Sequence, residues 1–244
     1  GMYDAALLST GSSLVAAKLL TSGKASVAFN PSGGLHHAMP GYASGFCVFN
    51  DQVIAINALR AHGLRVAYVD IDAHHGDGVQ EAFFDDDRVL TISVHESGRY
   101  LFPGTGFVSE LGQGAGRGYS VNLPLYPYTG DDEYLDAFKK IVPPLIKAFA
   151  PDVLVTQLGI DSYHTDPLTH LQVTTNGYVE AVRELASLNL PWLALGGGGY
   201  DLMAVARAWT LAYGVMLDAE WPDPLPKRFA FEHGVSNLRD SARP

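Results

Sequence analysis

The sequence is poor in cysteine and has no long apolar run. Cys47 is the single cysteine among 244 residues, so no disulfide can form within the chain, and its apolar neighbours favour a buried structural thiol. No apolar run approaches the roughly 20 residues that a helix needs to cross a bilayer. The first residues also lack the basic and then apolar pattern of a signal peptide. We therefore expect a cytoplasmic protein with no membrane attachment.

Charge is also sparse, and basic charge especially so. Charged residues make up 17% of the chain, the net charge is −10, and Lys and Arg form no cluster that could follow a phosphate backbone. We therefore do not expect direct binding to nucleic acid. An acidic surface would tolerate cationic substrates. Apolar residues make up 47%, which is enough for a core. We expect residues 1–244 to form a single domain, with 221–244 as a peripheral tail.

Short β-branched runs alternate with longer helical patterns. Several of the runs are almost continuously apolar, as in parallel strands that are covered on both faces. The predicted strands are Ala25–Phe29, Arg65–Ile71, Arg88–Val94, Tyr119–Leu123, Asp152–Gln157 and Trp192–Leu195. The predicted helices are Ala5–Leu20, Asp51–Ala61, Asp131–Phe149, Thr175–Leu188 and Leu202–Val215. The alternation predicts an α/β fold with an open, mostly parallel, doubly wound sheet flanked by helices.

Unusual polar residues follow five of the six predicted strands. Ligands gather at the carboxyl ends of strands in open α/β sheets, so we expect these groups to meet. They are His36 and His37 after the first strand, the segment 70–77 after the second, His95 after the third, Asp161 after the fifth and Tyr200 after the sixth.

The segment 70–78, D-I-D-A-H-H-G-D-G, concentrates carboxylates and imidazoles directly after an apolar strand. Asp72 and His74 are two residues apart and can share one face, and Asp161 supplies a third ligand. Three protein ligands with one open position are typical of catalytic zinc. The alternative is that these residues cap helices and form hydrogen bonds with one another. For the whole set this would leave unpaired charge buried, at a high cost in free energy. For His75 alone we favour that structural interpretation.

A metal-activated water needs a base, and the turn S-G-G-L-H-H offers His36 and His37. Asp70 and Asp77 are the carboxylates that remain to orient the two rings. Adjacent histidines alone are a weak motif, so this interpretation depends on the neighbouring ligands.

Four glycines, 196–199, precede Tyr200. The run lacks the Lys-Ser/Thr of a P-loop and the spaced glycines of a dinucleotide site, so we reject nucleotide binding. Glycines let the backbone approach a ligand closely, and the Tyr200 hydroxyl could then polarise a carbonyl opposite the metal. A structural tyrosine is the alternative.

Together these motifs resemble the zinc-dependent histone deacetylase family, and within it most closely the bacterial acetoin utilisation proteins. The resemblance extends from about Tyr3 to about Leu217, and the family normally has a longer N-terminal portion that is absent here. It is carried in order by H-H-A-M-P-G-Y-A-S-G-F-C-V-F-N-D, D-I-D-A-H-H-G-D-G, F-P-G-T-G, Q-L-G-I-D and L-G-G-G-G-Y.

The resemblance implies an arginase/deacetylase-like fold and a role for each site residue. It implies one Zn²⁺ on Asp72, His74 and Asp161; the pairs His36–Asp70 and His37–Asp77; and Tyr200 at the transition state. It places substrate contacts at Gly45, Phe46, Phe102, Leu168 and Gly198. It implies a structural K⁺ or Na⁺ on backbone or hydroxyl groups of Asp70, Asp72, His74, Ser93 and Val94, and a second near Phe83, Asp86, Val89 and Tyr119.

Arginases share this fold but hold two manganese ions. Here the positions two residues after His74 and Asp161 are Gly76 and Tyr163, so we expect one divalent metal. The implied activity is hydrolysis of acetyl-lysine, or of a related N-acylated amine, to acetate and free amine. An acetylpolyamine amidohydrolase and a catalytically silent acyl-lysine or metal-binding module are the alternatives, and the oligomeric state stays open.

Overall fold

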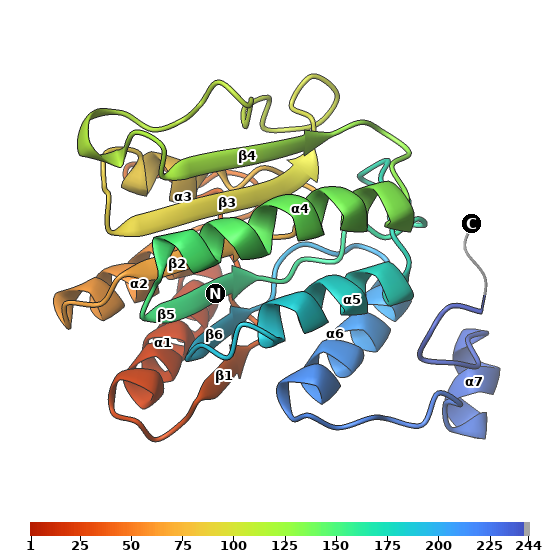
Figure 1. Ribbon diagram of the computed structural model, residues 1–244. Coiled ribbons are helices and arrows are strands. Elements are labelled where there is room, and N and C mark those ends of the chain that lie inside the picture. The colour runs from red at the N-terminus through yellow and green to blue at the C-terminus, as the bar shows by residue number, and fades with distance from the viewer. Residues whose placement is uncertain (242–244) are drawn as a thin grey trace.

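Six parallel strands form one open sheet in the computed structural model, which describes residues 1–241 (Figure 1). The order across the sheet is β1-β6-β5-β2-β3-β4. Every pairing is parallel. This agrees with the sequence, in which almost continuously apolar runs predicted parallel strands covered on both faces. The bounds are β1 Val27–Asn30, β2 Val66–Asp70, β3 Val89–Glu96, β4 Ser120–Leu125, β5 Val153–Gln157 and β6 Trp192–Leu195.

Helices cover both faces of the sheet (Figure 1). On one face, α1, α2 and α3 pack over a core that includes Ile56 and Tyr68. On the other, α4, α5 and α6 pack over a larger core that includes Phe138 and Tyr178. The bounds are α1 Met2–Thr21, α2 Asp51–Ala61, α3 Asp77–Phe83, α4 Asp131–Phe149, α5 Thr175–Ala186, α6 Leu202–Met216 and α7 Lys227–His233, with a 3₁₀ turn at Gly114–Gly116. The doubly wound α/β prediction is thereby confirmed.

The strand ends bring the predicted polar residues to one edge of the sheet. The last residue of β2, Asp70, lies in register with Gln157 of β5 on one side and Ser93 of β3 on the other. Gln157 is in turn aligned with Leu195, the last residue of β6. Because all strands run in one direction, the loops that follow them emerge together and form a common site.

The predicted helices and strands are present with bounds shifted by a few residues, and two short helices were not predicted. Both α3 and α7 have seven residues, too few for the apolar periodicity that identifies longer helices. In the segment expected to be a peripheral tail, α7 has no buried residue, whereas Leu238 is 6% exposed and Asp240 pairs with Arg207. The last three residues of that segment, 242–244, lie outside the described part of the chain. None of the described helices is long and apolar enough to cross a membrane.

Candidate metal centre

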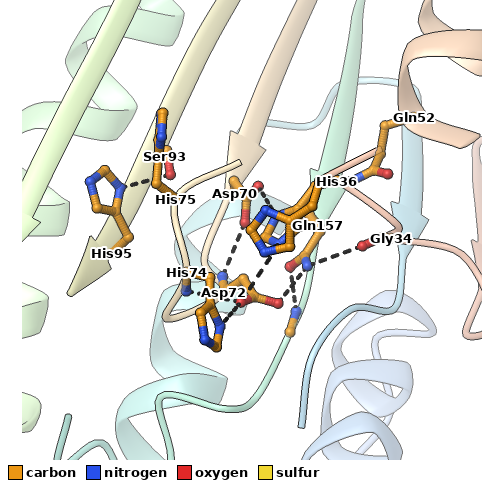
Figure 2. Close-up of polar contacts among 12 residues, drawn as sticks. Gly34, His36, Gln52, Asp70, Asp72, His74, His75, Ser93, His95 and Gln157 are labelled. Carbon is orange, nitrogen blue, oxygen red and sulfur yellow. Dashed lines mark hydrogen bonds and ion pairs between the residues drawn. The ribbon is translucent and has the colours of Figure 1, made fainter. Parts of the chain in front are cut away.

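Asp72, His74 and Asp161 converge on one point at the carboxyl edge of the sheet. Their candidate ligand atoms all lie within 4.8 Å of one another, and all three residues are buried. His74 Nδ1 lies 3.1 Å from Asp72 Oδ1 and 2.8 Å from Asp161 Oδ2. Two residues from the loop after β2 and one from the loop after β5 thus present two carboxylate oxygens and an imidazole nitrogen to a shared position. Figure 2 shows Asp72 and His74 at this place, beside His36 and Gln157.

The opposite oxygen of each carboxylate is held by donors from the protein. Asp72 Oδ2 accepts hydrogen bonds from Gln157 Nε2 (2.6 Å) and the Gly198 amide (2.7 Å). Asp161 Oδ1 accepts one from the Ala73 amide (2.6 Å). These bonds orient the ligands from outside, which is the usual support of a metal site.

Two glycines, which have no side chain, leave room for the carboxylates of the cluster. A Cβ on Gly198 would lie 2.3 Å from Asp161 Oδ2, and a Cβ on Gly159 would lie 2.1 Å from Asp72 Oδ2. Glycine is therefore required at both positions for the carboxylates to stand where they do.

The electrostatics of this cluster favour a cation. Burial and the nearby Asp72 raise the pKa of Asp161 to about 7. Burial alone would lower the pKa of His74, but its hydrogen bonds with Asp161 and Asp72 raise it to about 11. Two adjacent buried carboxylates are costly without a neighbouring positive charge. The donor set of two carboxylates and one imidazole therefore fits a divalent metal ion such as zinc.

His36 and His37 stand beside this cluster, each backed by a carboxylate. His36 Nδ1 lies 2.8 Å from Asp70 Oδ2, and His37 Nδ1 lies 2.7 Å from Asp77 Oδ1. Burial by itself lowers the pKa of His36, but the charges of Asp70 and Asp72 raise it overall. Burial and the neighbouring His36 lower the pKa of His37. The two rings therefore differ in basicity although they are adjacent in sequence.

Several supporting residues were missed by the sequence analysis. Asn50 Nδ2 donates to the carbonyls of His36 (3.0 Å) and Ala38 (3.1 Å) and so holds the histidine turn. The Tyr68 hydroxyl donates to Asp70 Oδ2 at 2.6 Å. For Gln157 the signal was its place beside Asp161 in Q-L-G-I-D, where a buried polar residue ends an otherwise apolar strand.

A cavity of about 230 Å³ opens over the candidate metal centre. Its lining includes His37, Gly45, Phe46, Phe102, Gly198 and Tyr200. A larger cavity of about 830 Å³ lies around the start of β6 and the end of α6, away from the carboxyl edge. We place the chemistry in the smaller cavity because Asp72 and His74, two of the three candidate ligands, line it.

Aromatic rings surround the mouth of this smaller cavity. The Phe102 ring meets His37 edge-on at 5.0 Å between centroids, and Phe46 meets Tyr200 at 6.1 Å. Phe46 is 83% exposed, so it stands at the mouth, while Phe102 is half exposed. Leu168 is also exposed and lies outside the lining of the cavity. The roles of these residues in substrate binding stay predictions.

His75 and His95 pair with groups other than the candidate ligands, and His95 still belongs to β3. His95 pairs with Ser93 Oγ (2.8 Å) and the Gly106 carbonyl (2.9 Å), and its ring lies 4.9 Å from that of His75 (Figure 2). His75 itself bonds Thr105 Oγ1 at 2.8 Å. The expectation that His95 joins the other strand-end groups was wrong, because its ring turns toward the loop 105–106.

The residues implied for monovalent cations occupy two places. Asp70 and Ser93 are partners in the β2–β3 register, beside Asp72, His74 and Val94. The second group lies near the beginning of β3, where the Phe83 carbonyl accepts from the Asp86 amide at 3.1 Å and the Tyr119 carbonyl from the Thr91 amide at 2.9 Å. Both cation sites stay predictions.

Comparisons with known proteins place the chain among its relatives. A family model described as the histone deacetylase domain matches residues 1–216. The acetoin utilization protein AcuC of Bacillus subtilis (strain 168) is 48% identical over 86% of this chain and 56% of its own length. Histone deacetylase 1 of Homo sapiens is 45% identical over 96% of this chain and 48% of its own length.

The fold of a solved relative agrees as well. A structure described as an HDAC homolog complexed with SAHA superposes with a TM-score of 0.92 at 36% identity, covering 98% of this chain and 68% of the other. The chain thus spans about half the length of the curated relatives it matches. The agreement of family model, relatives and fold shows that this chain belongs to the histone deacetylase family.

Proposed function

We propose that this protein is a zinc-dependent amidohydrolase that removes acetyl or related acyl groups from lysine side chains. The observation that carries the proposal is that two sets of groups lie together beside one cavity. One set is the buried ligand cluster Asp72, His74 and Asp161. The other is the carboxylate-backed pair His36 and His37, with Tyr200 on the same lining.

A divalent ion held by Asp72, His74 and Asp161 would polarise the amide carbonyl and lower the pKa of a water molecule, which would then lose a proton more readily and attack the carbonyl carbon. Both histidines line the cavity, and we take His37 as the base because its ring lies between Phe102 (5.0 Å between centroids) and His74 (5.9 Å), with Nδ1 fixed by Asp77. The Nε2 atoms of His36 and His37 lie 3.0 Å apart, so a proton taken up by one ring is shared with the other. The pair then returns the proton to the leaving amine.

Tyr200 supplies the second stabilising group. It comes from the loop after β6 and not from either loop that carries the ligands. Its hydroxyl can therefore approach the carbonyl oxygen from its own side and donate a hydrogen bond to the developing oxyanion. Tyr200→Phe removes this donor, and such a loss typically costs about 10²–10³-fold in kcat.

The residues at the mouth of the cavity favour a neutral acyl group on a long aliphatic stem. Phe46 and Phe102 offer apolar surface and no charge near its mouth, and Gly45 and Gly198 allow backbone to approach the substrate closely. We propose lysine as the acyl carrier, a K⁺ or Na⁺ with a structural role, a single catalytic domain and a cytoplasmic setting. One relative is named histone deacetylase 1, which is consistent with removal of acetyl groups from amines.

Turnover by metal-defined protein tests the proposal. The purified protein is loaded with zinc and offered acetyl-, propionyl- and crotonyl-lysine peptides and N-acetylputrescine. We expect acylated peptides to be hydrolysed with a higher kcat/KM than acetylputrescine. A preference for acetylputrescine would assign the protein to acetylpolyamines, and hydrolysis of none of them at full metal occupancy would overturn the proposed activity.

A further inference from the structure

Tyr200 follows a stretch of backbone that has no side chains of its own to hold it in place. It follows four glycines, of which Gly197 and Gly199 have φ values of +154°. Glycines have no side chains that could fix a loop by packing, and they cost more conformational entropy to order than other residues. A catalytic tyrosine at the end of such a run needs anchors from elsewhere in the fold.

The structure supplies anchors on both sides of Tyr200. Before it, the Gly198 amide donates to Asp72 and its carbonyl accepts from the Ile160 amide at 2.7 Å. After it, Asp201 caps α6 by accepting from the amides of Met203 (3.0 Å) and Ala204 (3.1 Å). These bonds hold the neighbouring residues and leave Tyr200 itself to be fixed.

Asp166 makes the bond to Tyr200 itself. Its Oδ2 accepts the backbone N–H of Tyr200 at 2.8 Å, and its Oδ1 accepts the N–H of Leu168 at 2.9 Å. Asp166 is 7% exposed, so water does not readily replace these partners. One buried carboxylate thus joins two loops, one that carries the tyrosine and one that carries Leu168.

The chemistry of the side chain matters at this position. A carboxylate accepts hydrogen bonds at both oxygens, whereas the amide of asparagine has one acceptor and one donor group. In Asp166→Asn the NH₂ group would face one of the two backbone N–H groups and repel it. The substitution preserves size and shape and breaks one of the two links.

We propose that Asp166 is a positioning residue for the reaction, which sets the place of the Tyr200 side chain through the Tyr200 backbone. This inference rests on the proposed function, in which Tyr200 stabilises the transition state. It assigns no contact with the substrate to Asp166.

The same junction offers a matched control. Thr165, the residue before Asp166, is exposed and donates from Oγ1 to Asp201 Oδ2 at 2.5 Å. Thr165→Val breaks a link between the same two loops but leaves the bond between Asp166 and the Tyr200 amide in place. A general loosening of this region would affect both variants alike.

The test is a double-mutant cycle of Asp166→Asn and Tyr200→Phe, with kcat and KM measured on an acetyl-lysine peptide at equal metal content. We expect Asp166→Asn to lower kcat by about 10–100-fold, as small misplacements of catalytic groups do. In the Tyr200→Phe background the same change should cost about twofold or less, because the hydroxyl that it misplaces is already gone. Thr165→Val should keep kcat within about twofold of the parent.

An equal loss in both backgrounds, or no loss in the parent, would overturn the inference while leaving the proposed function intact. A crystal structure of Asp166→Asn tests the inference independently of activity. It therefore decides the question even if the parent protein proves inactive. The Tyr200 ring should leave its edge contact with Phe46, now 6.1 Å between centroids. A ring that keeps its place would contradict the proposal.

Discussion

His36 and His37 face each other through their Nε2 atoms, which lie 3.0 Å apart. Each ring is bonded through Nδ1 to its own carboxylate, Asp70 or Asp77. Two imidazoles in this contact can place one proton between them, because two protons on facing nitrogens would repel. The geometry therefore allows one ring to accept a proton while the other stabilises the charge. Both rings line the cavity, and the His37 ring is the one that meets Phe102 near its mouth.

The first prediction concerns His37. His37→Ala should lower kcat for acyl-lysine hydrolysis by about 10²–10⁴-fold, the usual contribution of a general acid or base. Steady-state kinetics at equal zinc content measure the effect. His62→Ala, which changes an exposed histidine after α2, should have no effect. A His37→Ala enzyme with parental kcat would remove the pair from the mechanism.

The second prediction concerns the space around the ligands. In Gly198→Ala the new methyl group would lie 2.3 Å from Asp161 Oδ2 and 2.8 Å from Asp72 Oδ2. Because these oxygens have to shift, we expect zinc affinity to fall by about 10–100-fold, as when supporting contacts of a metal site are lost. Competition with a chelator of known affinity measures it. In Gly41→Ala the methyl group meets no atom within 4 Å, so equal affinities of the two variants would contradict the assignment of the ligands.

Sequence reasoning located the groups of the site but not how they are supported. Asp72, His74 and Asp161 were recognisable because charged residues directly after apolar strands are rare and carry a cost. Gln157 was not assigned a role, since its bond to Asp72 depends on how β2 and β5 align. Asp166 was missed for the same reason: its partner Tyr200 is 34 residues away in the chain.

The fold followed from periodicity wherever the elements were long. Burial on both faces makes the central strands almost continuously apolar, and the alternation of such short runs with helical patterns identified all six strands. The helix α3 begins with Asp77 and Gly78, which are poor helix formers, so its local preference gave no signal. The orientation of His95 toward Gly106 depends on the path of the loop 105–106, and the spacing of apolar residues does not predict the path of a loop.

The third prediction concerns the end of the described chain. Asp240 pairs with Arg207, and its Oδ2 accepts the Thr175 amide at 2.8 Å. Asp240→Asn leaves the largely buried Arg207 without its carboxylate, so we expect the free energy of unfolding to fall by about 1–3 kcal/mol at pH 7. Chemical denaturation measures this change. Asp87→Asn, at an exposed position before β3, should leave the stability unchanged.

The difference in the free energy of unfolding between the parent and Asp240→Asn should decrease at low pH. Burial alone would raise the pKa of Asp240, but hydrogen bonds from Thr175 and Arg207 lower it below its ordinary value of 3.8. A carboxyl group with a lowered pKa stabilises the fold above its unfolded-state pKa and loses that contribution as the pH falls through its folded-state pKa. The stability difference should therefore be constant near neutral pH and shrink below pH 3.8. A difference that grows on acidification would contradict the ion pair.

The most direct test of the account is a zinc titration of metal-free protein, with acetate release from an acetyl-lysine peptide followed at each step. We predict that activity is absent without metal, rises in proportion to bound zinc and reaches its maximum at one ion per chain, because Asp72, His74 and Asp161 form one site. Full activity in the metal-free protein, or a requirement for two ions per chain, would contradict the single-metal hydrolase described above.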